Sequence, residues 1–482
     1  MNPRQLAAYS KSLIAGNVVN MAKAKPDLLA QCLEQDRINA QGASVAAKRI
    51  VLTAVQKLPF IDLSALTGIP PRVRRLFLSL LENDSLIDPE IEQAIAVVRR
   101  AVLHAIATGQ DVTGFGIDLI AALGVFGFHH EFVISESDTE KNQRALLQRD
   151  TPIHLAAIAM YEPLPPSAET RALLGELDGQ HIDRLIRVQV DEPEQEWLLR
   201  STFPTLASIN NDISVSVQNQ YEENPYPRWW KMSDVASVPR YQAKNILIAG
   251  CGTGWEAIEI ALANPSAKLT ALDLSLASLA YAKRQADKYG AVNISFVQGD
   301  ILDIPASPKY DLIICSGVLH HMENPESGLR ALRNSVQEQG TVRLALYSES
   351  GRVAVVQCIE LRKQRNLPAT RDGICELRRE IYELPANSPI KSLLAWRDFY
   401  FVSDFRDLVF HVQEHRYTLP KIAALLEAGG LKFSRMVAPE QAIVSFSKEQ
   451  LGDANDLAAW TKFEINHPGA FGSMYQFEAV PI

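Results

Sequence analysis

The sequence is poor in cysteine and contains no long apolar run. Its five cysteines are scattered over 482 residues and form no C-x-x-C pair. This spacing excludes a disulfide-bonded scaffold and favours a reducing compartment. The most apolar window, residues 115–128, contains Asp118 and is shorter than the about 20 residues that span a membrane. The first residues also lack the apolar centre of a signal peptide. We therefore expect a soluble, cytoplasmic protein that does not enter a membrane.

The sequence also lacks an excess of basic residues. It has 48 lysines and arginines against 56 aspartates and glutamates, a net charge of −8. A protein that grips nucleic acid over a broad surface needs a clearly basic domain, so we expect no nucleic-acid partner. With 47% hydrophobic residues, the chain can bury a sizeable core.

The first 200 residues follow a helical rhythm. Apolar residues recur at the i, i+3, i+4 spacing of amphipathic helices, without a convincing fixed-period repeat. The predicted helices are 6–19, 27–35, 42–58, 70–81, 89–108, 113–127 and 143–160. We expect an all-α N-terminal domain at 1–204, followed by a connecting segment at 205–243.

From about residue 244 the pattern changes to strands alternating with helices. Predicted strands are 245–249, 268–274, 293–298, 310–315, 341–347, 431–437 and 474–480, and predicted helices are 254–263, 276–288, 325–336 and 419–428. Strands that alternate with helices form a parallel sheet covered on both faces. We therefore expect a doubly wound α/β domain at 244–482, with a charged helical insert at 351–410.

The strongest motif is a glycine-rich loop that follows the first of these strands. Residues 246–255 read ILIAGCGTGW, so an apolar strand runs through Gly250, Gly252 and Gly254 into a helix. Glycine lets the backbone approach a ligand closely because it has no Cβ. A dinucleotide fingerprint needs G-x-G-x-x-G, and Trp255 occupies its last position, which disfavours a nicotinamide-dependent oxidoreductase.

Acidic residues follow the next two strands. Asp273, before Leu274, ends the second strand, where a carboxylate accepts hydrogen bonds from a ribose diol. Asp300 ends the third strand, where it could accept from an adenine amine with Ile301 against the ring. A glycine loop followed by two acids at successive strand ends is much more specific than any one of these signals.

These residues resemble the catalytic domain of class I S-adenosylmethionine-dependent methyltransferases. The matching segments are ILIAGCGTG, LTALDLS, VQGDILDIP and YDLIICSGVLHHMENPESGLRAL. The resemblance implies a seven-stranded Rossmann-like sheet with an antiparallel last strand and S-adenosylmethionine across the strand ends. It implies that the cofactor contacts Gly250, Cys251, Gly252, Gly254, Asp273, Leu274, Asp300, Ile301 and Cys315.

A closer resemblance covers about residues 205–482. The segments ENPYPRW (223–229), SLASLAYAKRQ, FHVQEHRYTLP and FGSMYQFE are similar to a bacterial group of methyltransferases. In that group the N-terminal region is helical and often carries tetratricopeptide repeats. The methyl acceptor is not implied by this resemblance.

Three further residues are candidates for chemistry at the methyl group. His320 and His321 follow the fourth strand, where one could serve as a base near neutral pH; alternatively they pack against the backbone or face solvent. The segment 221–230, YEENPYPRWW, is stiffened by two prolines. It is either a lid, with Tyr226 at the reacting group and Tyr221 and Arg228 on the cofactor, or a linker whose tryptophans pack on the sheet.

The segment 411–415, HVQEH, also matches a short zinc-peptidase pattern. A proline follows almost at once and breaks the helix that such a site needs, so we predict no metal and a packing or acceptor-pocket role.

The sequence therefore predicts an S-adenosylmethionine-dependent methyltransferase whose helical N-terminal domain recognises a substrate or partner. A protein or peptide acceptor is favoured over a small metabolite, and a catalytically silent binding protein is the rival. The oligomeric state is not indicated.

Overall fold

The computed structural model describes residues 1–15, 18–58, 61–85, 87–232, 235 and 238–482. The chain forms two compact units, and each is described by itself. Unit 1 comprises Met1–Gln195, Arg228–Val235 and Asn366–Arg406; unit 2 comprises Glu196–Pro227, Ala236–Arg365 and Asp407–Ile482. Four residues of the predicted connecting segment, 233–234 and 236–237, lie outside the described residues, as do residues 16–17 of the first predicted helix.

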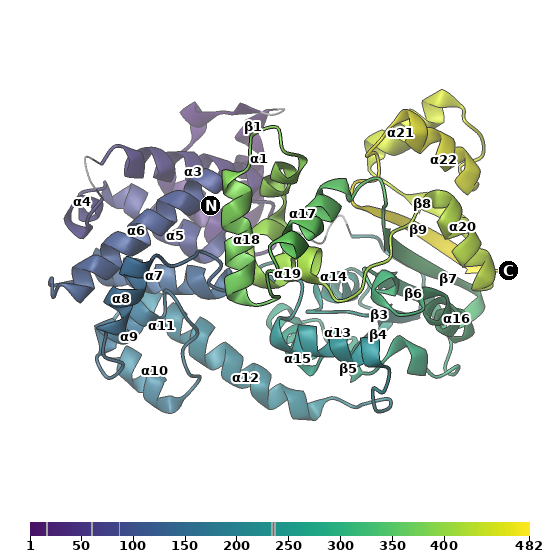
Figure 1. The fold of residues 1–482 in the computed structure, drawn as a ribbon, viewed down its shortest axis with the longest axis horizontal. Coiled ribbons are helices and arrows are strands. Elements are labelled where there is room, and N and C mark those ends of the chain that lie inside the picture. Colours follow the sequence, from purple (N-terminus) through teal and green to yellow (C-terminus); the bar gives the residue numbers. More distant parts are fainter. Residues whose placement is uncertain (16–17, 59–60, 86, 233–234, 236–237) are drawn as a thin grey trace. The chain divides into compact units, whose positions relative to one another are not determined.

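Unit 1 is built of helices (Figure 1). In chain order they are α1 (Pro3–Ser12), α2 (Pro26–Glu34), α3 (Gln41–Gln56), α4 (Leu63–Thr67), α5 (Pro71–Asn83), α6 (Pro89–Ala107), α7 (Phe115–His129), α8 (Asp138–Ala145), α9 (Pro152–Ile158), α10 (Ala168–Leu174), α11 (Gln180–Ile186), the first part of α12 (Glu192–Leu199), α18 (Arg371–Glu383) and most of α19 (Val402–Phe410). One short hairpin, β1 (Ile14–Ala15) with β2 (Val18–Val19), accompanies them.

Local signals explain where these helices begin. The Asp88 carboxylate accepts hydrogen bonds from the first free backbone N–H groups of α6, and Pro89 needs no such bond. The apolar window at 115–128 is the buried helix α7, as predicted. One helix was predicted at 143–160, but the structure has α8 and α9 with a break between them, because Pro152 cannot donate a helical hydrogen bond. Helix α1 ends at Ser12, earlier than predicted.

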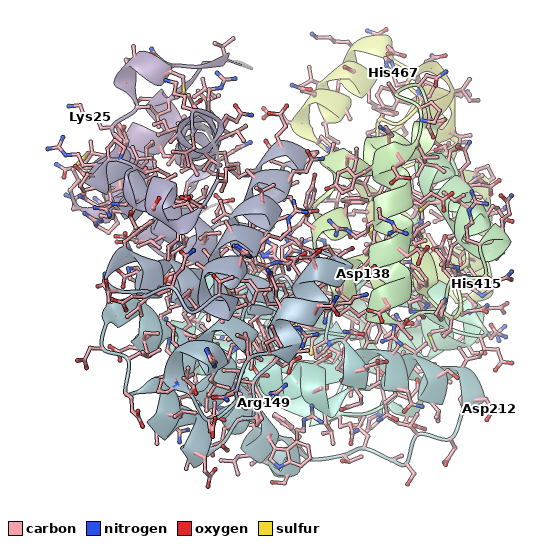
Figure 2. All side chains as sticks on the ribbon, turned by 60° about the vertical axis from the view of Figure 1, so that its left-hand side comes forward. Lys25, Asp138, Arg149, Asp212, His415 and His467 are labelled. Atoms are coloured by element: carbon pink, nitrogen blue, oxygen red, sulfur yellow. The ribbon has the colours of Figure 1, made fainter. Side chains whose placement is uncertain are left out.

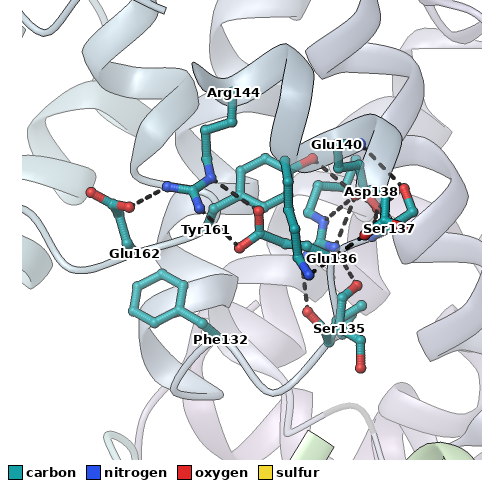
Figure 3. A network of polar contacts seen from close by, with 12 residues as sticks. Phe132, Ser135, Glu136, Ser137, Asp138, Glu140, Arg144, Tyr161 and Glu162 are labelled. Atoms are coloured by element: carbon teal, nitrogen blue, oxygen red, sulfur yellow. Dashed lines mark hydrogen bonds and ion pairs between the residues drawn. The ribbon is translucent and has the colours of Figure 1, made fainter. Parts of the chain in front are cut away.

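A buried ionic network ties α6 to α8 and to the turn that follows α9 (Figure 3). The Arg99 guanidinium donates to Glu140 at 2.9 Å and to the carbonyl oxygens of Ile134 and Ser135. The Tyr161 hydroxyl donates to Glu140 at 3.0 Å, and the Arg99 cation lies over the Tyr161 ring. Side chains of Arg99 and Glu140 are only 5% and 3% exposed, so this charge pair is fully enclosed.

The segment 366–406 belongs to unit 1 through a second buried ion pair. Arg378, on α18, pairs with Glu92 at 2.7 Å and donates to the Val133 carbonyl at 2.8 Å. The Tyr382 hydroxyl donates to the same glutamate. The charge pattern of this segment predicts an insert of the methyltransferase domain, because it does not reveal a partner almost 300 residues away. The division at 204 and 243 stays a prediction.

Unit 2 contains a seven-stranded mixed sheet in the order β5-β4-β3-β6-β7-β9-β8. The strands are β3 (Asn245–Ala249), β4 (Lys268–Asp273), β5 (Ile294–Gln298), β6 (Tyr310–Ser316), β7 (Val336–Tyr347), β8 (Leu431–Val437) and β9 (Met474–Pro481). Strands β3 to β7 are parallel, and β9 runs antiparallel to both of its neighbours. The predicted doubly wound α/β fold with a reversed last strand is confirmed.

Helices of unit 2 form two packed groups around the sheet (Figure 1). One group holds α13 (Asp212–Glu223), α14 (Trp255–Ala263) and α15 (Leu276–Tyr289); the other holds α16 (Pro325–Ser335), α20 (Leu419–Ala428) and α22 (Leu457–Asn466). Unit 2 also contains α17 (Val353–Gln364), α21 (Glu440–Glu449), the second part of α12 and the end of α19, which carries Asp407. Alternate strand residues, such as Leu247, Ile313 and Leu344, pack against the second group.

Among the residues that the structure describes, no helix has the length and apolar composition that crossing a membrane would require.

Candidate cofactor and acceptor site

The glycine loop connects β3 to α14 at the carboxyl ends of the parallel strands. Gly250, Gly252 and Gly254 have φ angles of 77°, 51° and 83°, which other residues rarely adopt. A Cβ on Gly252 would overlap the Tyr226 carbonyl oxygen, and one on Gly250 would overlap Val318. The loop therefore needs glycine both for its backbone angles and for close approach of neighbouring chain.

Asp273 ends β4 beside this loop. Its carboxylate accepts from the backbone N–H of Gly252 at 2.7 Å and of Ser275 at 2.9 Å. Burial raises the pKa of Asp273 to about 6, although these two hydrogen bonds oppose the shift. Each carboxylate oxygen retains a further lone pair, so Asp273 is able to accept from an additional donor such as a ribose hydroxyl.

The remaining predicted adenine-side residues follow β4 and β5. Asp300 is buried and accepts from the Leu302 N–H at 3.0 Å, with Ile301 buried beside it. The Leu274 carbonyl accepts from side-chain amides of Gln218 and Gln298. Because β5, β4 and β3 are neighbours in the sheet, these residues and the glycine loop meet at one edge. The neighbouring β6 lies at the point where strand order reverses, which is where open sheets bind ligands.

A strap, defined here as residues 221–227, lies directly over the glycine loop. The Thr253 N–H donates to the Tyr226 carbonyl at 3.0 Å, and the Thr253 hydroxyl donates to the Pro227 carbonyl at 2.6 Å. The strap begins in the last turn of α13, a helix that was not predicted from the sequence and whose first residue, Asp212, is labelled in Figure 2. The predicted lid therefore contacts the loop through its backbone.

The lid segment 221–230 is divided between the two units. Arg228 belongs to unit 1, where its N–H donates to Asp404 at 2.9 Å and its cation lies 5.1 Å from the Phe128 ring centre. Trp229 is buried in the same unit, at 4% exposure. The cofactor contact predicted for Arg228 stays a prediction.

Tyr221 points its hydroxyl at a carboxylate that the sequence analysis missed. The hydroxyl donates to Asp407 at 2.6 Å and lies 3.3 Å from His411 Nε2. The Tyr347 hydroxyl approaches the other Asp407 oxygen at 3.3 Å. Burial and the Asp407 charge hold the pKa of Tyr221 well above 10, so this phenol stays protonated.

His320 and His321 are buried between the ends of β6 and β7. His320 stacks on Tyr347 with ring centres 3.6 Å apart, and within the described residues neither of its ring nitrogens has a hydrogen-bond partner. His321 Nδ1 lies 2.7 Å from the Gln413 carbonyl. Burial holds the pKa of both histidines well below 6.5, so both are neutral at pH 7. Their role as a base stays a prediction.

The structure brings His321, Asp407 and His411 together, with possible ligand atoms within 4.8 Å of one another. The geometry nevertheless does not suit a metal ion. The two imidazole rings stack face to face, 3.5 Å apart and tilted by 23°. A histidine nitrogen binds a metal ion that lies in the plane of its imidazole ring. Two stacked and nearly parallel ring planes have no nearby point in common, so one metal ion cannot lie in both planes. In addition, the Gln413 N–H donates to His411 Nδ1, which leaves the proton on Nε2.

Further residues at this site were not predicted from the sequence. Arg352 is 1% exposed, lies over the Tyr347 ring at 3.6 Å and pairs with Glu414 at 2.7 Å. The Tyr347 ring is thus covered by Arg352 and by His320. The only available signals were Tyr347 ending a predicted strand and Glu414 lying in the HVQEH segment. Cys315, predicted beside the cofactor, is buried in β6, and burial raises its pKa to about 12.

Comparisons with known proteins support the assignment of this domain. Residues 242–383 match the family described as "Methyltransferase domain". An uncharacterized protein of Synechococcus sp. is 32% identical over 265 residues, which span 48% of this chain and 62% of that protein. The malonyl-[acyl-carrier protein] O-methyltransferase of Halalkalibacterium halodurans is 31% identical over 153 residues, which span 31% of this chain and 52% of that enzyme. The chain thus covers less than two thirds of either relative.

Among solved structures, PKMT2 from Rickettsia typhi in complex with AdoHcy aligns with a TM-score of 0.38 and 14% identity, over 58% of this chain and 54% of that chain. Likeness at this level adds nothing to the case for function. The predicted methyltransferase class is confirmed at the level of the domain by the family match, whereas the cofactor S-adenosylmethionine and the activity of the whole chain are proposals. Residues 242–383 thus match a methyltransferase family, and the seven-stranded sheet of unit 2 extends beyond this match to β8 and β9.

Proposed function

We propose that the whole chain is an S-adenosylmethionine-dependent methyltransferase. The observation that supports this most is the meeting of three motifs at adjacent strand ends: the glycine loop after β3, Asp273 after β4 and Asp300 after β5. Each motif alone occurs in many α/β proteins. Their combination fits a ligand that carries an amino acid, a ribose and an adenine along one sheet edge.

The residues present fit such a cofactor. The glycine loop lies beside Asp273, which accepts from the Gly252 N–H and has lone pairs left for a ribose diol. S-adenosylmethionine, when bound, supplies a methyl group on a positively charged sulfur. The chain's own contribution is then to hold the acceptor in line with that methyl group and to exclude water, and positioning of this kind is worth up to about 7–11 kcal/mol.

The strap is suited to the exclusion of water. The carbonyl oxygens of Tyr226 and Pro227, both on the strap, accept hydrogen bonds from Thr253, so the strap covers the glycine loop. Cofactor entry therefore requires these bonds to open or the cofactor to enter beside them. Tyr226, on the strap, is our candidate for a residue beside the reacting group.

For the acceptor, a protein or peptide is favoured over a small metabolite. Unit 1 is a large helical module without a cofactor motif of its own, and such modules commonly hold a polypeptide. The Halalkalibacterium relative is by its name an O-methyltransferase of a malonyl group on a carrier protein. A catalytically silent binding protein is the rival, and the intact glycines with both aspartates disfavour it.

Titration calorimetry with S-adenosylhomocysteine tests the cofactor site. We expect binding by the intact chain and a loss of affinity in Asp273→Ala. Asp311→Asn is a matched control, because Asp311 caps Lys244 and Asn245 at the opposite end of the strands. Labelled S-adenosylmethionine is then incubated with protein and cell lysate. Label in a macromolecular fraction supports a protein acceptor, and label in the small-molecule fraction supports a metabolite. A folded chain that does not bind S-adenosylhomocysteine refutes the proposal.

A further inference from the structure

Asp407 is a buried carboxylate without a cationic partner. It is 2% exposed, and its hydrogen-bond donors are the hydroxyls of Tyr221 and Tyr347. In the part of the chain that the structure describes, no lysine, arginine or histidine is ion-paired with it. Buried charges in proteins are normally paired or bound to a ligand, so an enclosed carboxylate of this kind indicates a site for a cation.

The neighbouring charged groups do not neutralise Asp407. Arg352 directs its guanidinium to Glu414 at 2.7 Å, and Arg416 approaches the same glutamate at 3.7 Å. The three surrounding imidazoles, His320, His321 and His411, carry no charge at neutral pH, because burial lowers the pKa of each. Asp407 is one of the anionic neighbours that hold the pKa of Arg352 raised against burial, so Arg352 acts on this carboxylate from beyond ion-pair distance. Among the described residues no cation is in direct contact with Asp407, and a positively charged ligand would supply that contact.

Aromatic rings complete a site of this chemistry. The rings of Tyr221 and Tyr226 are nearly parallel, tilted by 22°, with centres 6.4 Å apart. An ammonium group between two such faces lies within cation–π range of both, and a carboxylate with aromatic faces is a common way to bind alkylammonium ions. His320 adds two buried ring nitrogens that have no hydrogen-bond partner among the described residues, and a bound ligand is one way to satisfy such groups.

Two positive groups could face Asp407: the acceptor or the sulfonium of the cofactor. The cofactor motifs follow β3, β4 and β5, whereas Asp407 accepts hydrogen bonds from Tyr347 at the end of β7 and from Tyr221 on the strap. Tyr347 is the last residue of β7, and His320 follows β6. The acceptor side of the site is therefore the better match for the Asp407 carboxylate.

We propose, building on the methyltransferase function proposed above, that the methyl acceptor is an amine nitrogen whose alkylammonium form binds against Asp407 between Tyr221 and Tyr226. The ammonium transfers one proton to the Asp407 carboxylate and becomes a neutral amine. The nitrogen lone pair then forms the N–C bond while the C–S bond breaks, with its electron pair kept by sulfur in S-adenosylhomocysteine. The product is a methylated ammonium, and protonated Asp407 returns its proton to solvent.

Charge selectivity of the acceptor site tests this proposal. The chain is first saturated with S-adenosylhomocysteine, and n-butylammonium, n-butanol and butanoate are then titrated separately while ligand-observed NMR measures binding. We expect n-butylammonium to bind at least about tenfold more tightly than the other two, which corresponds to about 1.4 kcal/mol. Equal or tighter binding of butanoate or butanol, or no binding of n-butylammonium, overturns it. This comparison uses the unmodified chain, so it does not depend on any variant folding.

Asp407→Asn assigns the selectivity to the carboxylate. We expect this variant to lose the preference for n-butylammonium, while Asp311→Asn retains it. The affinities for S-adenosylmethionine and S-adenosylhomocysteine are measured in both variants. If Asp407→Asn weakens the sulfonium form selectively and leaves n-butylammonium binding unchanged, then Asp407 faces the cofactor and the proposal is wrong.

The chemical stability of the labelled product gives an independent check. A methyl group on nitrogen survives mild alkali, whereas a methyl ester releases its label as volatile methanol. We expect the label to stay with the alkali-treated acceptor fraction, and volatile label overturns the amine assignment. Failure of S-adenosylhomocysteine to bind at all would refute the methyltransferase function itself, whereas binding without ammonium selectivity refutes only this inference.

Discussion

The two units each enclose charged side chains, but they pair them to very different degrees. In unit 1, Glu140 accepts from Arg99, from the Tyr161 hydroxyl and from both the N–H and the hydroxyl of Ser137. In unit 2, Asp407 has two tyrosine hydroxyls and no cation, and His320 has no hydrogen-bond partner within the described residues. A fully satisfied network rigidifies a fold, whereas buried polar groups that lack partners call for a separate explanation, and a ligand is the one proposed above for Asp407 and His320.

The pKa directions follow the same contrast. Burial alone would raise the pKa of Glu140, but Arg99 and the Ser137 hydrogen bonds outweigh it, so the pKa is lowered. At His320 burial acts in the same direction as the nearby Arg352 charge, and the pKa falls well below 6.5. In unit 1 the surroundings of Glu140 stabilise its charged form, whereas in unit 2 the surroundings of His320 keep its ring neutral.

The largest expected effect comes from breaking the complete network. Glu140→Ala leaves the buried Arg99 cation without its partner, and we expect a loss of about 3–5 kcal/mol in the free energy of unfolding. Asp407→Asn removes an uncompensated buried charge, so we expect no loss or a small gain. Urea denaturation followed by circular dichroism measures both. The contrast fails if Asp407→Asn is as destabilising as Glu140→Ala.

The lid segment offers a second contrast, because it supplies residues to both units. Trp229 is buried in unit 1, and removal of a large aromatic side chain from a core costs about 3–5 kcal/mol. Tyr226 is half-buried beside the glycine loop, so we expect Tyr226→Ala to lower turnover more than thermal stability. Melting temperature, cofactor affinity and turnover are compared for Trp229→Ala and Tyr226→Ala. Normal turnover in Tyr226→Ala, or a failure of that variant to fold, excludes a lid role.

A smaller effect is expected at Asp273, a buried carboxylate whose donors are backbone groups. Asp273→Ala removes the acceptor for a ribose diol, and loss of hydrogen bonds to a charged group costs about 1.5–3 kcal/mol, or roughly 10- to 150-fold in affinity. Calorimetric titration with S-adenosylhomocysteine measures this loss. Unchanged affinity in a folded variant would remove Asp273 from the site.

The smallest effect is a dependence of cofactor affinity on pH. The pKa of Asp273 is raised to about 6, so the carboxylate takes up a proton as the pH falls through that value. A protonated carboxyl group accepts less well from a diol, and we expect affinity to fall by up to about tenfold between about pH 7.5 and about pH 5. The slope should flatten in Asp273→Asn. Affinity that rises on acidification in the unmodified chain would contradict the assignment.

Much of the sheet domain could be predicted from the sequence. Strands β3, β8 and β9 lie within one residue of their predicted bounds, because short apolar runs bounded by glycine or turn residues are strong local signals. Strand β7 begins at Val336, earlier than predicted, because Val336 already pairs with Tyr310 of β6 before a register shift leads to the pairing of Leu312 with Thr341. Helix α13 was missed because it is polar and its packing against α15 cannot be read locally.

Local sequence by itself determined the parts of this protein that depend on neighbouring residues. The glycine loop, the acids after β4 and β5, and the strand–helix alternation all lie within short segments, and they were enough to predict the fold class and the cofactor. Only the tertiary structure decided which distant residues meet. It joined Arg378 to Glu92 within unit 1, and Tyr221 to Asp407 beside His320 within unit 2. The physical reason is that pairing across almost 200 residues or more leaves no periodic signal along the chain, because the fold alone brings such side chains within hydrogen-bond distance.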